Sequence, residues 1–254
     1  MYKNKSGQVT IFIIVGLILA FTILAIAYFG GWIKNDNLST ENPTAYMKNC
    51  ILDSIKKSEN IILESNTYPQ FNSYNYILYN QEKIPYLCTV SEFYNPCIPQ
   101  DSAFFTRVKK IMENMIAVDT QNCLNKMYKD FDKSGYDVQN KPGELVLEIF
   151  PEYISVRINE TVYAKKDYDS YSFSEFESIY YTKLYDMLKL TQTIVNYEST
   201  YCEFNKLNWM KSYNDIIIST TTTSDSTKVY TLQDRLTDRK IKFAIKTCVL
   251  PAGI

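Results

Sequence analysis

The sequence predicts an α+β protein: an N-terminal transmembrane helix followed by an extracytoplasmic domain of antiparallel sheet with packed helices. Three observations lead to this fold class. Residues 9–29 form a long apolar run without a charge. Apolar residues then recur at helical spacing in several segments, and other segments alternate with period two. The hydrophobic content of 46% and the charged content of 22% are ordinary for a globular chain with a sizeable core.

The predicted transmembrane helix covers residues 9–33. A bilayer core needs about 20 apolar residues at a rise of about 1.5 Å each, and the run supplies this length. Lys3 and Lys5 precede it without an acidic residue, so residues 1–8 are expected to be a cytoplasmic leader. We therefore expect a single-pass protein of the cell membrane with an extracellular C-terminal domain. Cleavage of the run as a secretory signal is the alternative.

Residues 34–44 are polar and predict a linker, and residues 45–254 are expected to form the extracytoplasmic domain. All six cysteines lie in that domain, and an even number is typical of an oxidising compartment. Scattered core thiols in a reducing compartment are the alternative. The expected partners are the membrane, other envelope proteins and a second copy joined through the transmembrane helix.

Six cysteines allow fifteen connectivities, so the pairing needs further reasons. Cys88 and Cys97 are nearest in sequence and enclose a short loop with a proline. Cys50 and Cys123 each lie on the apolar face of a predicted helix, so helix packing is expected to join them. The two remaining cysteines follow a long helix and lie on the last strand. The predicted disulfides are Cys50–Cys123, Cys88–Cys97 and Cys202–Cys248.

Helical spacing predicts three helices. Asn42 and Pro43 suit the N-cap and first position of one helix, Gly135 suits the position just after a second, and Ser174 with Glu177 forms a capping box for a third. The predicted helices begin at Pro43, Asp101 and Ser174 and end near Asn66, Gly135 and Val195, with a break in the second at Asp119.

Period-two alternation predicts a β-hairpin around Phe150-Pro151-Glu152. The tyrosine- and proline-rich residues 68–100 show no clean period and predict an irregular segment. The predicted strands cover 145–149, 153–158, 161–163, 215–221, 227–232 and 241–250.

Catalytic chemistry has little support in the sequence. The chain has no histidine, which excludes Ser-His-Asp, Cys-His and His-metal sites. Residues 130–135 match the start of an EF-hand loop, but Lys141 stands where calcium needs a carboxylate. Ser54 and Lys57 fit the S-x-x-K spacing, yet Ser54 shares an apolar helix face. We predict a protein that is not an enzyme and has no catalytic residue, cofactor or metal site.

Two further features concern partners and modification. The net charge of −1 and the scarcity of arginine provide no electrostatic attraction for nucleic acid, so none is expected as a partner. The triplets Asn37-Leu-Ser39 and Asn159-Glu-Thr161 are glycosylation sequons, which makes Asn37 and Asn159 candidate sites.

The start of the chain carries a family resemblance. Residues 3–8 (KNKSGQ), followed directly by the apolar run, resemble the basic leader of archaeal class III signals and type IV pilin precursors. In that family a membrane peptidase cuts between leader and helix, which implies cleavage between Gly7 and Gln8. Phe12 stands where pilins usually carry an acidic residue that partners a neighbouring subunit, so the resemblance does not extend to filament assembly.

A wider resemblance covers most of the chain. It is carried by GQVTIFIIVGLILA, Cys50-Ile51, Ile84-Pro85-Tyr86, the helix with Cys123, Gly135-Tyr136 and LVLEIFPEYISVRI. These segments resemble an uncharacterised group of single-pass proteins from small-genome archaea of the DPANN type. The resemblance implies an archaeal envelope protein and brings no activity.

The sequence therefore predicts a membrane-anchored structural or adhesive protein of the cell envelope, pilin-like, with no catalytic role. The alternative is an anchored extracytoplasmic module that binds a ligand or a protein, such as a sensor. An exposed aromatic patch on the outer domain would favour interaction, whereas a deep pocket lined by carboxylates would favour ligand binding or catalysis.

Overall fold

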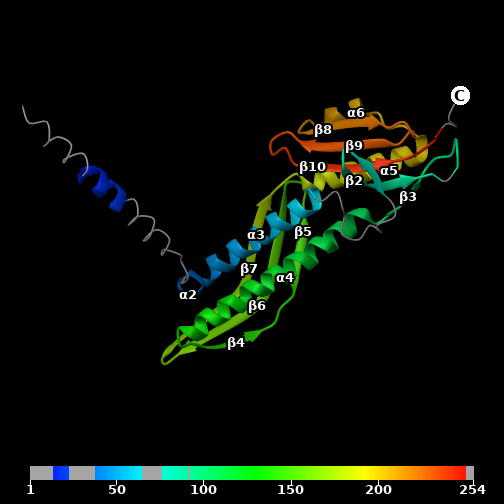
Figure 1. Ribbon diagram of the computed structural model, residues 1–254. Helices are drawn as coiled ribbons and strands as arrows, with labels where there is room; N and C mark the ends of the chain where they lie inside the picture. Colours follow the sequence, from blue (N-terminus) through cyan, green and yellow to red (C-terminus); the bar gives the residue numbers. More distant parts are fainter. Residues whose placement is uncertain (1–13, 23–37, 65–75, 91, 250–254) are drawn as a thin grey trace, which may run out of the picture.

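The computed structural model describes residues 14–22, 38–64, 76–90 and 92–249 (Figure 1). These residues form an α+β fold with two sheets and helices packed on them. The helices of the domain are α2 (Leu38–Glu41), α3 (Pro43–Glu64), α4 (Phe104–Lys133), α5 (Leu184–Tyr201) and α6 (Lys206–Ser212). The strands are β1 (Tyr76–Tyr79), β2 (Glu82–Thr89), β3 (Ile98–Pro99), β4 (Asp137–Lys141), β5 (Leu145–Ile149), β6 (Tyr153–Lys166), β7 (Asp169–Tyr181), β8 (Ile216–Thr222), β9 (Lys228–Asp234) and β10 (Lys240–Ile245).

The first sheet is built around the long strand β6. β7 pairs antiparallel with β6 along one edge, and β4 and β5 pair one after the other along the opposite edge. Helices α3 and α4 lie side by side across one face of this sheet (Figure 1). Alternate residues of β6 are therefore buried under the helices, while the residues between them lie on the open face.

The second sheet has the order β1-β2-β10-β9-β8, with β3 paired to β2. Its strands are antiparallel except for β2 and β10, which run parallel. Helix α5 packs against β2, β3 and β10, and α6 packs against β8. One main hydrophobic core runs from the α3–α4 layer to the inner face of this sheet, and a small cluster of Ile84, Val229 and Ala244 lies separately.

The structure corrects the predicted transmembrane helix. Of residues 9–33 it describes 14–22, and these residues are helical. Among the described residues, no helix has both the length and the apolar character needed to cross a membrane. The predicted leader 1–8, with the processing candidates Gly7 and Gln8, lies outside the described residues.

The predicted third helix is also corrected at its start. Ser174 and Glu177 belong to strand β7, and the helix α5 begins only at Leu184, where Thr182 Oγ1 accepts a hydrogen bond from the Leu184 N–H at 3.2 Å. Glu175 has a φ of 56°, which breaks the alternation of β7. Since the period-two pattern is interrupted there, apolar residues four apart gave a false helical signal.

Three smaller predictions also differ from the structure. The segment predicted to be irregular contains β1, β2 and β3, because β2 is paired on both sides and its order comes from neighbours far away in sequence. Helix α4 continues through Asp119 without a break. The predicted linker 34–44 contains the short helix α2.

Several local signals are confirmed. The Asn42 side chain accepts a hydrogen bond from the Ala45 N–H at 3.0 Å at the start of α3. After α4, Gly135 has a φ of 82° and its N–H donates to the Asp132 carbonyl, while Tyr136 N–H donates to the Phe131 carbonyl. This is the Schellman arrangement that ends many helices. The predicted hairpin is formed by β5 and β6, although β6 also includes the third predicted strand.

The six cysteines lie in the three predicted pairs, each at a distance that a disulfide spans. The Cα–Cα distance is 6.5 Å for Cys50–Cys123, 5.4 Å for Cys88–Cys97 and 5.8 Å for Cys202–Cys248. The first pair joins α3 to α4, and the second closes the loop between β2 and β3. The third ties the end of α5 to the segment after β10.

The first prediction concerns these disulfides. One double variant replaces Cys50 and Cys123 by alanine and opens a loop with a sequence separation of 73. The other replaces Cys88 and Cys97 by alanine and opens a loop with a sequence separation of 9. The chain-entropy model gives losses in the free energy of unfolding of about 4 and about 2.6 kcal/mol, respectively. Urea unfolding of the two double variants measures the difference. Equal losses would contradict the entropic account for this chain.

The second prediction concerns Gly143, which lies between β4 and β5 where the register of β6 with β7 shifts. A Cβ at this position would lie 2.1 Å from the carbonyl oxygen of Asn159, so the backbone would have to move. We expect Gly143→Ala to lower the free energy of unfolding by about 1–3 kcal/mol. Gly16→Ala is the control, because a Cβ at Gly16 meets nothing within 4 Å. Thermal unfolding of both variants tests this.

Candidate functional site

The junction of the two sheets contains a fully buried carboxylate, that of Glu59 in α3. Arg239, at the turn between β9 and β10, donates from Nη1 to one of its oxygens, and Thr182 donates from Oγ1 to the other. Burial raises the pKa of Glu59, while these hydrogen bonds and the charge of Arg239 act in the opposite direction. One carboxylate thus connects α3 to the end of β7 and to the second sheet.

The turn that carries Arg239 is ordered by a second buried carboxylate. Asp234 accepts hydrogen bonds from the Leu236 N–H at 2.9 Å and from Thr237 Oγ1 at 2.6 Å. Its own N–H donates to the Arg239 carbonyl at 2.9 Å. The guanidinium also lies over the ring of Tyr180, 5.6 Å from the centroid. The position of Arg239 is therefore fixed from both sides.

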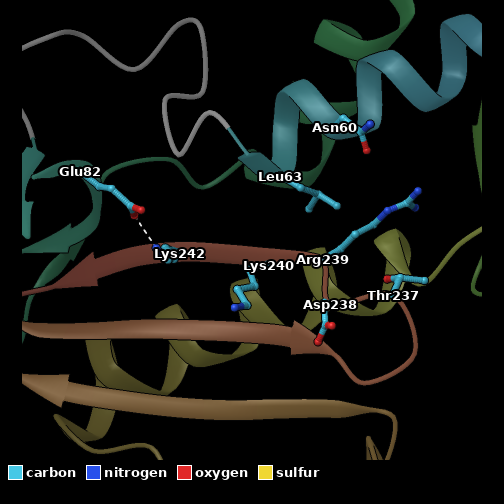
Figure 2. A pocket seen from close by; sticks show the side chains of 8 residues that line it. All are labelled: Asn60, Leu63, Glu82, Thr237, Asp238, Arg239, Lys240 and Lys242. Carbon is cyan, nitrogen blue, oxygen red and sulfur yellow. Dashed lines mark hydrogen bonds and ion pairs between the residues drawn. The ribbon is translucent and has the colours of Figure 1, made fainter. Parts of the chain in front are cut away.

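A pocket of about 310 Å³ is lined by Arg239 of this ion pair and by seven further residues (Figure 2). Most of its charged groups are engaged with neighbours: Lys242 pairs with Glu82, as the dashed line in Figure 2 shows, and Asp238 accepts a hydrogen bond from Gln233 at 2.7 Å. Lys240 is the exception, because it makes no ion pair within the described residues. The lining residues are Asn60, Leu63, Glu82, Thr237, Asp238, Arg239, Lys240 and Lys242.

This pocket, the junction pocket, is poorly suited to a charged ligand. Its volume is at the lower limit of about 300 Å³ for small-molecule sites. A ligand would also have to compete with ion pairs that are already formed. We therefore assign the Glu59–Arg239 contact a structural role.

The third prediction follows from the raised pKa of Glu59. In the folded state Glu59 holds its proton above its ordinary pKa of 4.5, whereas the unfolded chain releases it there. The folded state therefore binds more protons in that range, and the stability contributed by this group falls as pH rises above 4.5. Glu59→Gln should remove this contribution to the pH dependence, measured as the free energy of unfolding between about pH 4 and about pH 7. Identical slopes in the two proteins would contradict it.

A different surface lies on the open face of the first sheet. Phe150, Tyr153 and Tyr181 form a row across β5, β6 and β7, and we call them the aromatic row. The ring centroids are 4.8 Å apart for Phe150–Tyr153 and 6.2 Å for Tyr153–Tyr181. Phe150 is 39% exposed and Tyr181 is 75% exposed. Exposed neighbouring aromatic residues on a rigid sheet are typical of contact surfaces.

Polar side chains continue from the aromatic row along the same face. Arg157 Nη2 lies 3.3 Å from Glu177 Oε1, and Ser155 donates to the same oxygen at 3.1 Å. Lys109 of α4 donates to Glu148 at 2.8 Å. Phe150 and Tyr153 of the aromatic row line a groove of about 260 Å³ with these polar residues of the sheet, and we call it the sheet-face groove; Tyr181 stands beside it, against Tyr153. The groove is lined by Val146, Glu148, Phe150, Tyr153, Ser155, Arg157, Asn159, Glu177 and Ile179.

The motifs that the sequence singled out for chemistry are not assembled into a site. Ser54 Oγ donates to the Cys50 carbonyl at 2.9 Å, and Lys57 pairs with Asp119 at 2.9 Å, so the two do not act on each other. In the EF-hand-like segment, Asp130 accepts a hydrogen bond from Ser39. Within the described parts of the chain, no group of three or more potential metal-ligating side chains occurs.

The glycosylation candidates are placed only in part. Asn159 is exposed and lines the sheet-face groove. Asn37 lies outside the described residues. Glycosylation of Asn37 and Asn159 stays a prediction.

The aromatic row and the buried Glu59 were both missed by sequence reasoning. The three aromatic residues come from separate segments of the chain, so the row is found only once the pairing register of the strands is known. Tyr153 and Tyr181 are opposite each other in the β6–β7 ladder, while Phe150 directly follows β5. A weak signal existed in the alternation of β6, which marks Tyr153 as facing away from the core.

Comparisons with protein-family models, with curated proteins and with solved structures found no match. The predicted resemblance to archaeal envelope proteins with a pilin-like start stays a prediction. The function is therefore argued from the surface of the molecule.

Proposed function

We propose that this chain is an adhesive protein of the cell envelope that acts outside the cytoplasm, with the open face of the β5–β7 sheet as its contact surface. The observation that carries the proposal is the exposed aromatic row. Phe150, Tyr153 and Tyr181 lie next to Ile179, which is 48% exposed, and Val146, which is 41% exposed. Apolar side chains gathered on one face lose unfavourable contact with water when a partner covers them.

Two features of the scaffold support this proposal. The three cysteine pairs fit an oxidising compartment. The contact residues lie on strands of a sheet whose other face is packed under α3 and α4, so their positions are fixed before a partner arrives. A preorganised surface loses little conformational entropy on binding, so it binds a partner more favourably than a flexible loop with the same contacts would.

The second candidate function is a module that binds a small ligand in the junction pocket. The observation in its favour is Lys240, whose charge has no ion-pair partner among the described residues. A carboxylate or phosphate group is the ligand that such a lysine would attract. The ion pairs already present in the pocket make this candidate the weaker one.

The fourth prediction tests the contact surface with the full chain and an envelope fraction from the source cells, measured by co-sedimentation. The double variant Phe150→Ser/Tyr181→Ser should weaken binding at least about tenfold, because exposed aromatic contacts contribute roughly 0.5–1.5 kcal/mol each beyond their buried area. Tyr168→Ser is the matched control, since Tyr168 is a fully exposed tyrosine at the β6–β7 turn.

Two outcomes separate the candidates. Unchanged binding by the double variant would contradict the sheet face as the contact surface. Loss of binding on Lys240→Ala, with the double variant unaffected, would favour the junction pocket instead.

A further inference from the structure

We infer that the sheet-face groove binds a neutral glycan chain, with sugar rings lying on the aromatic row. The inference rests on the proposed function and names the chemical class of its partner. A sugar ring has apolar C–H faces and a rim of hydroxyl groups, so its site needs both aromatic surface and hydrogen-bonding side chains. The groove has these two components next to each other.

The aromatic component has the form of a strip. Its rings follow one another at 4.8 and 6.2 Å across three neighbouring strands, inclined by 32° and 62°. Such a strip offers several aromatic contacts in series to a linear chain of sugar rings. A single aromatic side chain would support only one ring.

The polar component offers donors and acceptors together. Arg157 and the amide of Asn159 supply donors, Glu148 and Glu177 supply acceptors, and Ser155 supplies both. A hydroxyl group donates and accepts at once, so this mixture suits it. The side chain of Asn159 is exposed, and no hydrogen bond to it is formed within the described residues.

The charges of the groove favour a neutral ligand. Arg157 is paired with Glu177, and Glu148 is paired with Lys109. Neither sign of charge is left over to attract a phosphate, an acidic polymer or a basic peptide. Ion pairs of this kind still leave oxygen and nitrogen atoms accessible to hydroxyl groups, because Arg157 and Glu177 keep 55% and 40% of their side chains exposed.

A protein partner, including a second copy of this chain, fits the groove less well. The centres of protein interfaces are depleted of charged residues, and here the pair Arg157–Glu177 lines the groove itself. Covering it with an apolar protein surface would remove water from both charges, which is unfavourable unless new hydrogen bonds replace that water. Sugar hydroxyls replace that water with hydrogen bonds.

The test uses the full chain and envelope fractions with and without periodate, which cleaves the vicinal diols of sugars. Periodate treatment should lower co-sedimentation about tenfold or more, the loss expected for the double variant Phe150→Ser/Tyr181→Ser. Affinity electrophoresis in gels containing mannan, hydroxyethylcellulose or xylan then identifies the sugar, and Arg157→Gln should reduce any retardation. Tyr168→Ser should behave as the wild type in every arm.

The outcomes separate this inference from the proposed function. Binding that survives periodate but is lost in the double variant overturns the glycan inference and leaves the adhesive function standing, with a protein as partner. A dimer in sedimentation velocity that dissociates in the double variant overturns it in favour of a second copy. Binding that is unaffected by the double variant overturns both proposals.

Discussion

The arrangement of the two sheets depends on how the buried charge of Glu59 is balanced. Its carboxylate has no exposed surface, and Arg239 and Thr182 reach it from separate parts of the chain. Separating the sheets would leave this charge without its cation, which is far more costly than losing a surface ion pair. The contact thereby sets one orientation between the helix-covered sheet and its neighbour.

The open face of the first sheet depends on strand β6, whose buried and exposed residues alternate regularly. Its buried residues alternate from Ile154 to Ala164, although the register with β7 shifts on the way. The irregularity is absorbed elsewhere: Glu175 takes a left-handed backbone conformation in β7, and Gly143 allows the chain to pass close to β6 between β4 and β5. The face that carries the aromatic row is therefore continuous.

Features with a local cause were predictable, and features formed by distant residues were not. Pro43, Gly135 and the alternation of β5 and β6 act through their immediate neighbours, so the sequence predicts them. The cysteine pairs followed because helix faces and loop lengths restrict which sulfurs meet. Glu59 and Arg239 are 180 residues apart, and no pattern in the sequence links them. The apolar run at residues 9–29 predicted a membrane span, whereas no helix among the described residues has the length and apolar character for one.

The parallel pairing of β2 with β10 has a consequence for synthesis. Tyr86 and Cys88 of β2 meet Ala244 and Ile245 of β10, so this ladder joins segments made early and late. As the chain emerges, one edge of β2 has no β10 to bond with, and contacts between such distant segments form slowly. An unpaired apolar strand edge invites association between chains. Until β10 has been made, the nascent protein would thus benefit from a chaperone that covers the unpaired edge of β2.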